Sequence, residues 1–199
     1  MCRACRGGTP LSRGESFQVN HIAFLLAALG AAVPAAAQDL AQIDPKLAEI
    51  PAIAAELLAS DDPMARLSGA LALCIPGTYD PQVAMDVLEG AGWNALEGEG
   101  GQIGYDFDGT FETLVTVDTI GSFCMVQSLS MGTADLTGAL LGVVEALELP
   151  DASMPGSTAE DCAILDTGLG IEAIVHGSDD GGTCLTEDPS EVRFTMPDV

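Results

Sequence analysis

Residues 102–128 read QIGYDFDGTFETLVTVDTIGSFCMVQS, and this stretch decides the fold class. Apolar and polar side chains alternate within it in three short runs, at residues 102–107, 111–117 and 122–128. Alternation with a period of two is typical of a strand with one buried face. Asp108-Gly109 and Ile120-Gly121 separate the runs and supply the turns. The stretch therefore predicts a three-stranded antiparallel meander.

Two helices are predicted ahead of this meander. Each begins with an acidic residue followed by proline, at Asp62-Pro63 and at Asp80-Pro81. This pair is a typical start signal, because the carboxylate caps the first turn and proline fits its backbone. We expect Pro76-Gly77 to end the first helix soon after Cys74, and Gly90 to end the second.

A longer helix and further strands are predicted after the meander. Leucine and valine recur at helical spacing over residues 134–147, and Thr133 is the expected cap of this helix. Alternating runs at residues 161–165, 170–176 and 191–195 predict more strands. The order is helices, three strands, a helix, then two or three strands. It predicts an α+β domain with a mostly antiparallel sheet of about five to seven strands, covered by helices.

The first 37 residues have the three-part order of a secretory signal peptide. A basic lead contains Arg3, Arg6 and Arg13, residues 22–33 are apolar, and small residues end at Ala37. We therefore expect cleavage between Ala37 and Gln38. The apolar run is shorter than the roughly 20 residues that a membrane span needs, so no stable membrane anchor is expected after cleavage.

Three segments follow from this assignment. Residues 1–37 are the signal peptide, and residues 38–60 are an alanine-rich lead in which Pro45 and Pro51 interrupt short helical pieces. Residues 61–199 are expected to form a single α+β domain, since a chain of this length supports one hydrophobic core.

The cysteines agree with export. Signal removal leaves four of the six, Cys74, Cys124, Cys162 and Cys184. An even number in an exported chain predicts two disulfides, for which three pairings are possible. We favour Cys74–Cys124 and Cys162–Cys184, because the second pair brackets one hairpin-like segment. The expected location is the periplasm or the secreted fraction.

The charge balance limits the possible partners. The chain has 30 acidic and 6 basic residues, a formal charge of −24. Signal removal takes away one acidic and three basic residues, which leaves 29 and 3, a charge of −26. Such a surface repels the phosphates of nucleic acids and anionic lipids, and it favours a basic protein or envelope component. A solvated surface that only keeps the protein soluble is the alternative.

The residues Asp106, Asp108 and Glu112 are the candidate metal ligands. Alternating carboxylates around Gly109 are suited to a hard cation such as Ca²⁺. An EF-hand would need a further ligand before the glycine and a glutamate six residues after it, whereas Glu112 follows after three. Asp-Gly is also a strong hairpin signal, so we favour a plain turn.

No catalytic motif stands out. His176 is the one imidazole left after signal removal, and its nearest hydroxyls in sequence, Ser178 and Thr183, belong to no known arrangement. The glycine-rich segments lack the lysine and hydroxyl residue of a phosphate-binding loop, so no cofactor is indicated.

The chain resembles small exported proteins of alphaproteobacteria that have no assigned activity. The resemblance is carried by Gly92-Trp93, by Gly121-Ser-Phe-Cys-Met-Val126 in a strand, and by the element order over residues 61–196. The order is also similar, more distantly, to type III secretion chaperone-like domains. The resemblance implies a compact α+β domain and assigns no functional residue.

These observations favour an exported, non-catalytic binding module, for example one that captures a basic protein as periplasmic lysozyme inhibitors do. One alternative is a structural module stabilised by Ca²⁺. The other is a periplasmic hydrolase that uses His176, or an inhibitor of a basic hydrolase.

Overall fold

The computed structural model of the protein describes residues 35–120, 123–149, 151–157, 162–177, 184 and 189–197. Residues 1–34 of the expected signal peptide lie outside this range. The two residues at the expected cleavage site, Ala37 and Gln38, lie in the first helix.

Five helices lie within the described residues: α1 (Ala35–Ile43), α2 (Pro45–Leu58), α3 (Pro63–Tyr79), α4 (Pro81–Gly90) and α5 (Thr133–Ala146). The helices α2, α3 and α4 each start at a proline that follows an aspartate. The carboxylates of Asp44, Asp62 and Asp80 accept hydrogen bonds from backbone N–H groups two residues on, at 2.8, 3.0 and 3.0 Å. The start signals at Asp62-Pro63 and Asp80-Pro81 are therefore confirmed.

The predicted end of α3 at Pro76 is wrong, because the helix continues to Tyr79. Residues 69–78 are buried between α2 and the sheet, and the backbone N–H of Asp80 still donates to the Pro76 carbonyl at 3.0 Å. Packing of this turn offsets the one helical hydrogen bond that a proline removes. The same holds in α2, which passes through Pro51 without interruption and buries Ile50 and Ala54.

The prediction that Thr133 caps α5 is also wrong. The cap position is Gly132, and no side chain makes the capping hydrogen bond. The Thr133 hydroxyl instead donates to the carbonyl of Cys184 at 3.0 Å, which ties the start of the helix to a distant segment.

Over the described part of the chain the sheet has eight strands, and every neighbouring pair is antiparallel. Its strands are β1 (Asn94–Glu97), β2 (Gln102–Asp106), β3 (Thr113–Asp118), β4 (Phe123–Ser128), β5 (Ser153–Gly156), β6 (Ala163–Asp166), β7 (Glu172–Gly177) and β8 (Ser190–Thr195). The predicted α+β class is confirmed, and β2, β3 and β4 form the expected meander. The short edge strands β1 and β5 were not anticipated.

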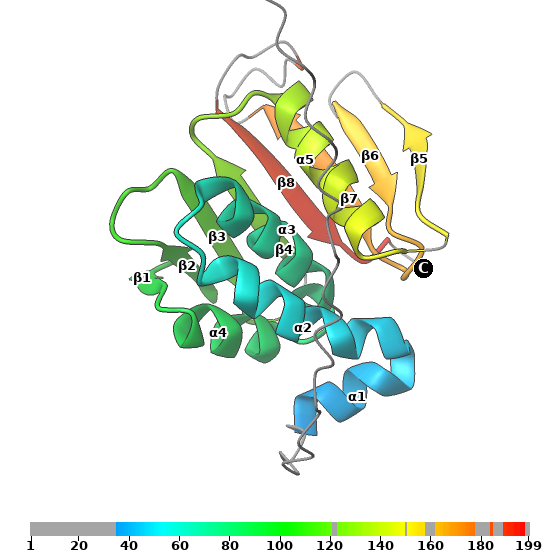
Figure 1. The fold of residues 1–199 in the computed structure, drawn as a ribbon, viewed down its shortest axis with the longest axis horizontal. Coiled ribbons are helices and arrows are strands. Elements are labelled where there is room, and N and C mark those ends of the chain that lie inside the picture. Colours follow the sequence, from blue (N-terminus) through cyan, green and yellow to red (C-terminus); the bar gives the residue numbers. More distant parts are fainter. Residues whose placement is uncertain are drawn as a thin grey trace, which may run out of the picture. The chain divides into compact units, whose positions relative to one another are not determined.

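The strand order is β1-β2-β3-β4-β8-β7-β6-β5, which divides the sheet into two four-stranded meanders. The first half contains β1 to β4 and the second half contains β5 to β8. The strands β4 and β8 join them along the middle of the sheet, with Val126 opposite Val192. Figure 1 shows the helices in front of one face, with α3 over the middle strands and α5 along the second half.

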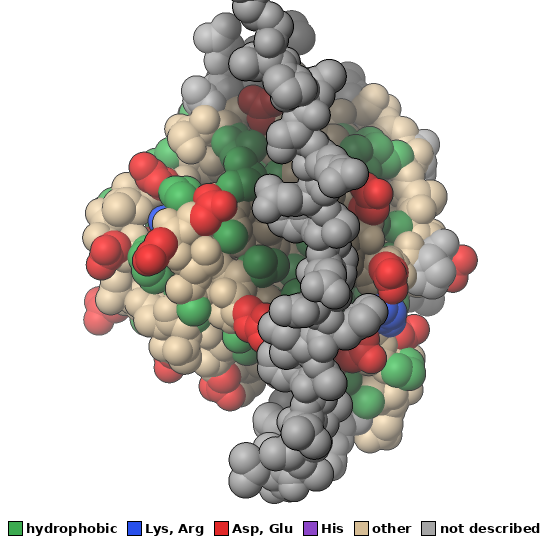
Figure 2. Space-filling view, viewed as in Figure 1, with side chains coloured by type: hydrophobic (Ala, Val, Ile, Leu, Met, Phe, Trp, Pro, Cys, Tyr) green, Lys and Arg blue, Asp and Glu red, His purple; other side chains and the backbone are tan. Residues whose placement is uncertain are grey.

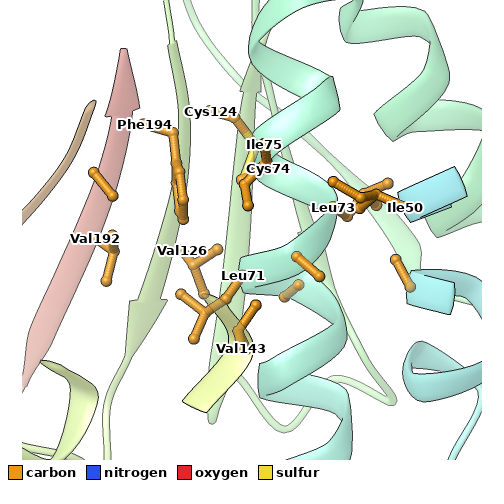
Figure 3. Packing of buried hydrophobic residues seen from close by; sticks show 14 of the residues in the cluster. Ile50, Leu71, Leu73, Cys74, Ile75, Cys124, Val126, Val143, Val192 and Phe194 are labelled. Carbon is orange, nitrogen blue, oxygen red and sulfur yellow. A yellow bond between two sulfur atoms is a disulfide. The ribbon is translucent and has the colours of Figure 1, made fainter. Parts of the chain in front are cut away.

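The core lies between α3 and this face of the sheet. Leu71 and Ile75 point from α3 toward Val126 and Phe194, and all four side chains are buried (Figure 3). The disulfide between Cys74 and Cys124 lies among them. Side chains of residues 38–60 belong to the same core, because Leu40, Leu47, Ile50, Ala54 and Leu58 are all buried in it.

Candidate binding groove

An apolar groove of about 430 Å³ opens on the helical side of the molecule. Side chains of α2, α3 and α5 line it, and among the described lining residues Ser68 is the single polar one. The larger side chains are Ile53, Leu57, Met64, Val143 and Leu147; the smaller ones are Ser68, Ala72, Ala139, Ala146 and the bare backbone of Gly142. We call this feature the helical groove.

Close packing of α2 on α3 forms one side of the helical groove. A Cβ atom at Gly69 would lie 2.9 Å from the backbone nitrogen of Leu58, so only glycine permits this approach. The opposite side is α5, which packs on β7, β8 and α3. Ser68 and Ala72 carry short side chains on α3, so the space between α2 and α5 stays open.

Large apolar side chains are exposed at the helical groove. Met64 is 49% exposed and Ile53 is 44% exposed, although both border a well-filled core. Figure 2 shows acidic side chains spread over the visible part of this face, with apolar side chains between them. An apolar patch framed by charged groups is typical of an interaction site.

The charged residues next to the helical groove are acidic. Glu56 lies on α2 between the lining residues Ile53 and Leu57, and Asp135 and Glu145 lie on α5. All three are exposed. Arg66 of α3 is directed elsewhere, since its guanidinium lies 4.4 Å from the centre of the Phe107 ring and donates to the Ser60 carbonyl at 2.8 Å.

The structure places the candidate metal ligands at the β2–β3 hairpin without gathering them into a site. Asp106 is buried, with Oδ2 lacking a hydrogen-bond partner, whereas Asp108 and Glu112 are exposed. Thr110 closes the turn through its N–H and hydroxyl to the Phe107 carbonyl, and Asp108 takes a left-handed φ of 61°. Within the described residues, no group of three or more His, Cys, Asp or Glu side chains could hold a metal ion.

His176 lies on β7 directly opposite Glu191 of β8. Its neighbours along β7, Val175 and Ala173, are buried toward the helices, so His176 belongs to the opposite face of the sheet, away from the helical groove. The hydroxyl residues considered with it, Ser178 and Thr183, lie outside the described residues.

Both predicted disulfides are confirmed. Cys74–Cys124 joins α3 to β4 and spans 50 residues, and Cys162–Cys184 spans 22. Two disulfides indicate an oxidising environment outside the cytoplasm. In the part of the chain that the structure describes, no helix combines the length and apolar character needed to cross a membrane.

Two tyrosines near the helices have altered acidity. Burial raises the pKa of Tyr105 to about 12, and the negative charge of Glu89 adds to this effect. The Tyr105 hydroxyl donates a hydrogen bond to Oε1 of Glu89 at 3.3 Å. Burial also raises the pKa of Tyr79, with a smaller effect from Asp44. The Tyr79 hydroxyl donates to the Leu169 carbonyl at 2.6 Å and so links α3 to the loop before β7. These phenols hold the fold together and lie outside the lining of the groove.

Comparison with known protein families, curated proteins and solved structures finds no match. The helical groove was not predicted from the sequence, because its lining combines α2 and α3 with α5, which lies far from them along the chain. The available signal was the run of small residues on α5 at Ala139, Gly142 and Ala146, which departs from the leucine and valine pattern around it.

Proposed function

We propose that this protein is an exported, non-catalytic binding module of the periplasm, or of the secreted fraction, that captures a basic protein or envelope component. The observation that carries the proposal is the helical groove, an exposed apolar surface bordered by carboxylates. Basic hydrolases are one class of partner that such a module would inhibit.

Export is supported by two independent features. The first 37 residues have the order of a cleavable signal peptide, and the chain that follows forms two disulfides. The first feature concerns targeting and the second concerns the redox state of the compartment.

The choice of a basic partner is supported by charge. A mature chain with 29 acidic and 3 basic residues attracts cations over a distance of about 8–10 Å at physiological ionic strength. Attraction of this kind speeds encounter and selects the sign of the partner, whereas buried apolar area holds the complex together. The helical groove supplies the apolar area.

The test is native mass spectrometry of the protein taken from the periplasm of its own host at low salt. We expect a chain that begins at Gln38, lacks four hydrogens because of two disulfides, and carries a bound basic protein. High salt should release that partner. A mass that includes residues 1–37 would refute export, and a bare monomer at low salt would refute capture of a partner.

A further inference from the structure

We propose that the helical groove binds one amphipathic helix of the partner, with an apolar stripe facing the groove and lysine or arginine on its flanks. This inference rests on the proposed function and specifies the structural element that is bound. Its basis is the shape, the lining and the charge of the groove.

The lining requires a ligand that brings its own apolar side chains. The lining residues on α5 run from Ala139 to Leu147, and those on α3 from Met64 to Ala72. Each run covers about two turns of helix, or roughly 12 Å at 1.5 Å per residue. A volume of about 430 Å³ along this length accommodates several side chains in a row.

The lining also favours a helix over an extended peptide. An extended segment binds either by adding a strand to a free sheet edge or as a polyproline-type helix in an aromatic-lined groove, and none of the described lining residues is aromatic. The free edges are β1 and β5, at the two ends of the sheet, whereas the groove is built from helices. Within a helix the backbone hydrogen bonds are internal, so a helix can enter an apolar groove without losing them.

Acidic residues near the groove favour basic residues on the flanks of the bound helix. Asp135 lies one turn before Ala139 on α5, and Glu145 lies beside Ala146. Together with Glu56 on α2, these exposed carboxylates are neighbours of lining residues on the two helices that form the sides of the groove. Basic flanks on the bound helix complement them, whereas the acidic headgroup of a lipid or fatty acid would be repelled.

Two glycines of α5 allow a matched test. A Cβ atom at Gly142 or at Gly138 meets nothing within 4 Å, so either position accepts a larger side chain. Gly142 lines the groove and Gly138 does not. We therefore compare Gly142→Leu, which fills the groove, with Gly138→Leu, which places the same side chain one turn earlier on α5, beyond the residues that line the groove.

The probe is an amidated 16-residue peptide with leucine at helical spacing and lysine on the flanks. One control peptide has the same composition in scrambled order, and another has glutamate in place of lysine. A protein of this charge attracts any cationic peptide, so the comparison with the scrambled peptide isolates the contribution of the apolar stripe. Affinities are measured by fluorescence anisotropy on the mature protein.

We expect Gly142→Leu to weaken binding of the amphipathic peptide at least tenfold and Gly138→Leu to change it less than twofold. The scrambled and acidic peptides should each bind at least tenfold more weakly than the probe. Both variants should melt no lower than the natural protein, because leucine is a better helix former than glycine. Lost binding in Gly142→Leu then cannot result from unfolding.

Equal affinity of the two variants for the probe, or equal binding of the scrambled peptide, would overturn the helix proposal. Native mass spectrometry of Gly142→Leu from the periplasm separates this failure from that of the proposed function. If the variant still carries a basic partner, the groove assignment is wrong and capture of a basic protein stands. If a fatty acid or phospholipid is found in the natural protein in place of a helix, the groove binds lipid and both proposals fall.

Discussion

The two halves of the sheet share one strand connectivity but differ in their helical cover. The first half, β1 to β4, lies under α3 and α4, and α2 adds a second layer. The second half, β5 to β8, is covered by α5, with α3 reaching β8 at the middle. Figure 1 shows this contrast directly. The hydrophobic core runs under both covers, and the helical groove lies where α2 and α3 of the first cover meet α5 of the second.

The disulfides of the two halves also differ, in how deeply they are buried. Cys74–Cys124 is fully buried and fastens a core helix to a central strand. Cys162–Cys184 lies near the outer strands, where Cys162 is only partly buried and packs at the margin of the core. The contrast leads us to expect that the first disulfide contributes more to stability than the second.

Removing each disulfide in turn should give the largest effect. In the chain-entropy description, links of 50 and 22 residues stabilise by about 4 and about 3 kcal/mol, respectively. We expect Cys74→Ala with Cys124→Ala to lower the free energy of unfolding more than Cys162→Ala with Cys184→Ala. The difference should exceed the entropic one, because the first pair also leaves a cavity in the core. Urea titration measures both, and a larger loss from the second pair would reverse the comparison.

Shortening one buried leucine in each half tests whether the cover of the second half packs as tightly as that of the first. Leu71 of α3 is 0% exposed and Leu140 of α5 is 1% exposed. Each change to alanine should cost about 2–5 kcal/mol, with the higher value at Leu71, because cost rises with the cavity that cannot collapse. Leu141→Ala, at an exposed position of α5, is the control and should change stability by less than about 1 kcal/mol. A cost at Leu140 as small as that at Leu141 would show that α5 is loosely held.

The smallest effect that we expect is a loss of stability at alkaline pH, caused by Tyr105 in the first half of the sheet. Tyr105, with its pKa raised to about 12, stays protonated in the folded state when the unfolded chain ionises near 10. Its stabilising effect is therefore complete below pH 10 and is lost as the pH rises from 10 toward 12. Tyr105→Phe should reduce this loss when urea unfolding is compared at pH 9 and pH 11. An unchanged pH dependence in the variant would exclude Tyr105 as the cause.

Local signals in the sequence predicted much of the fold. The Asp-Pro starts of α3 and α4, the alternation in β2 to β4 and the cysteine pairing depend on residues close together or on simple chemistry, and each is confirmed. The prediction of Pro76 as a stop failed because buried contacts of α3 outweigh the local preference of proline.

Features that depend on distant segments could not be predicted in this way. The edge strand Asn94–Glu97 shows mostly exposed side chains and no alternation, so its pairing with β2 leaves no pattern in the sequence. The helical groove depends on the spacing of α2 and α5 across α3, which no local pattern encodes. The sequence did predict the turn at Asp108-Gly109. It did not predict the burial of Asp106, because that burial arises only when the hairpin packs into the fold.

The position of β8 has a consequence for the order of assembly. Among the described strands it is the last along the chain, yet it lies between β4 and β7 and joins the second meander to the first through its pairing with β4. Until residues 190–195 are in place, β4 and β7 both keep an open edge and the apolar face under α3 lacks Val192 and Phe194. The sheet can therefore close only after the C-terminal strand has been made and has reached this central position.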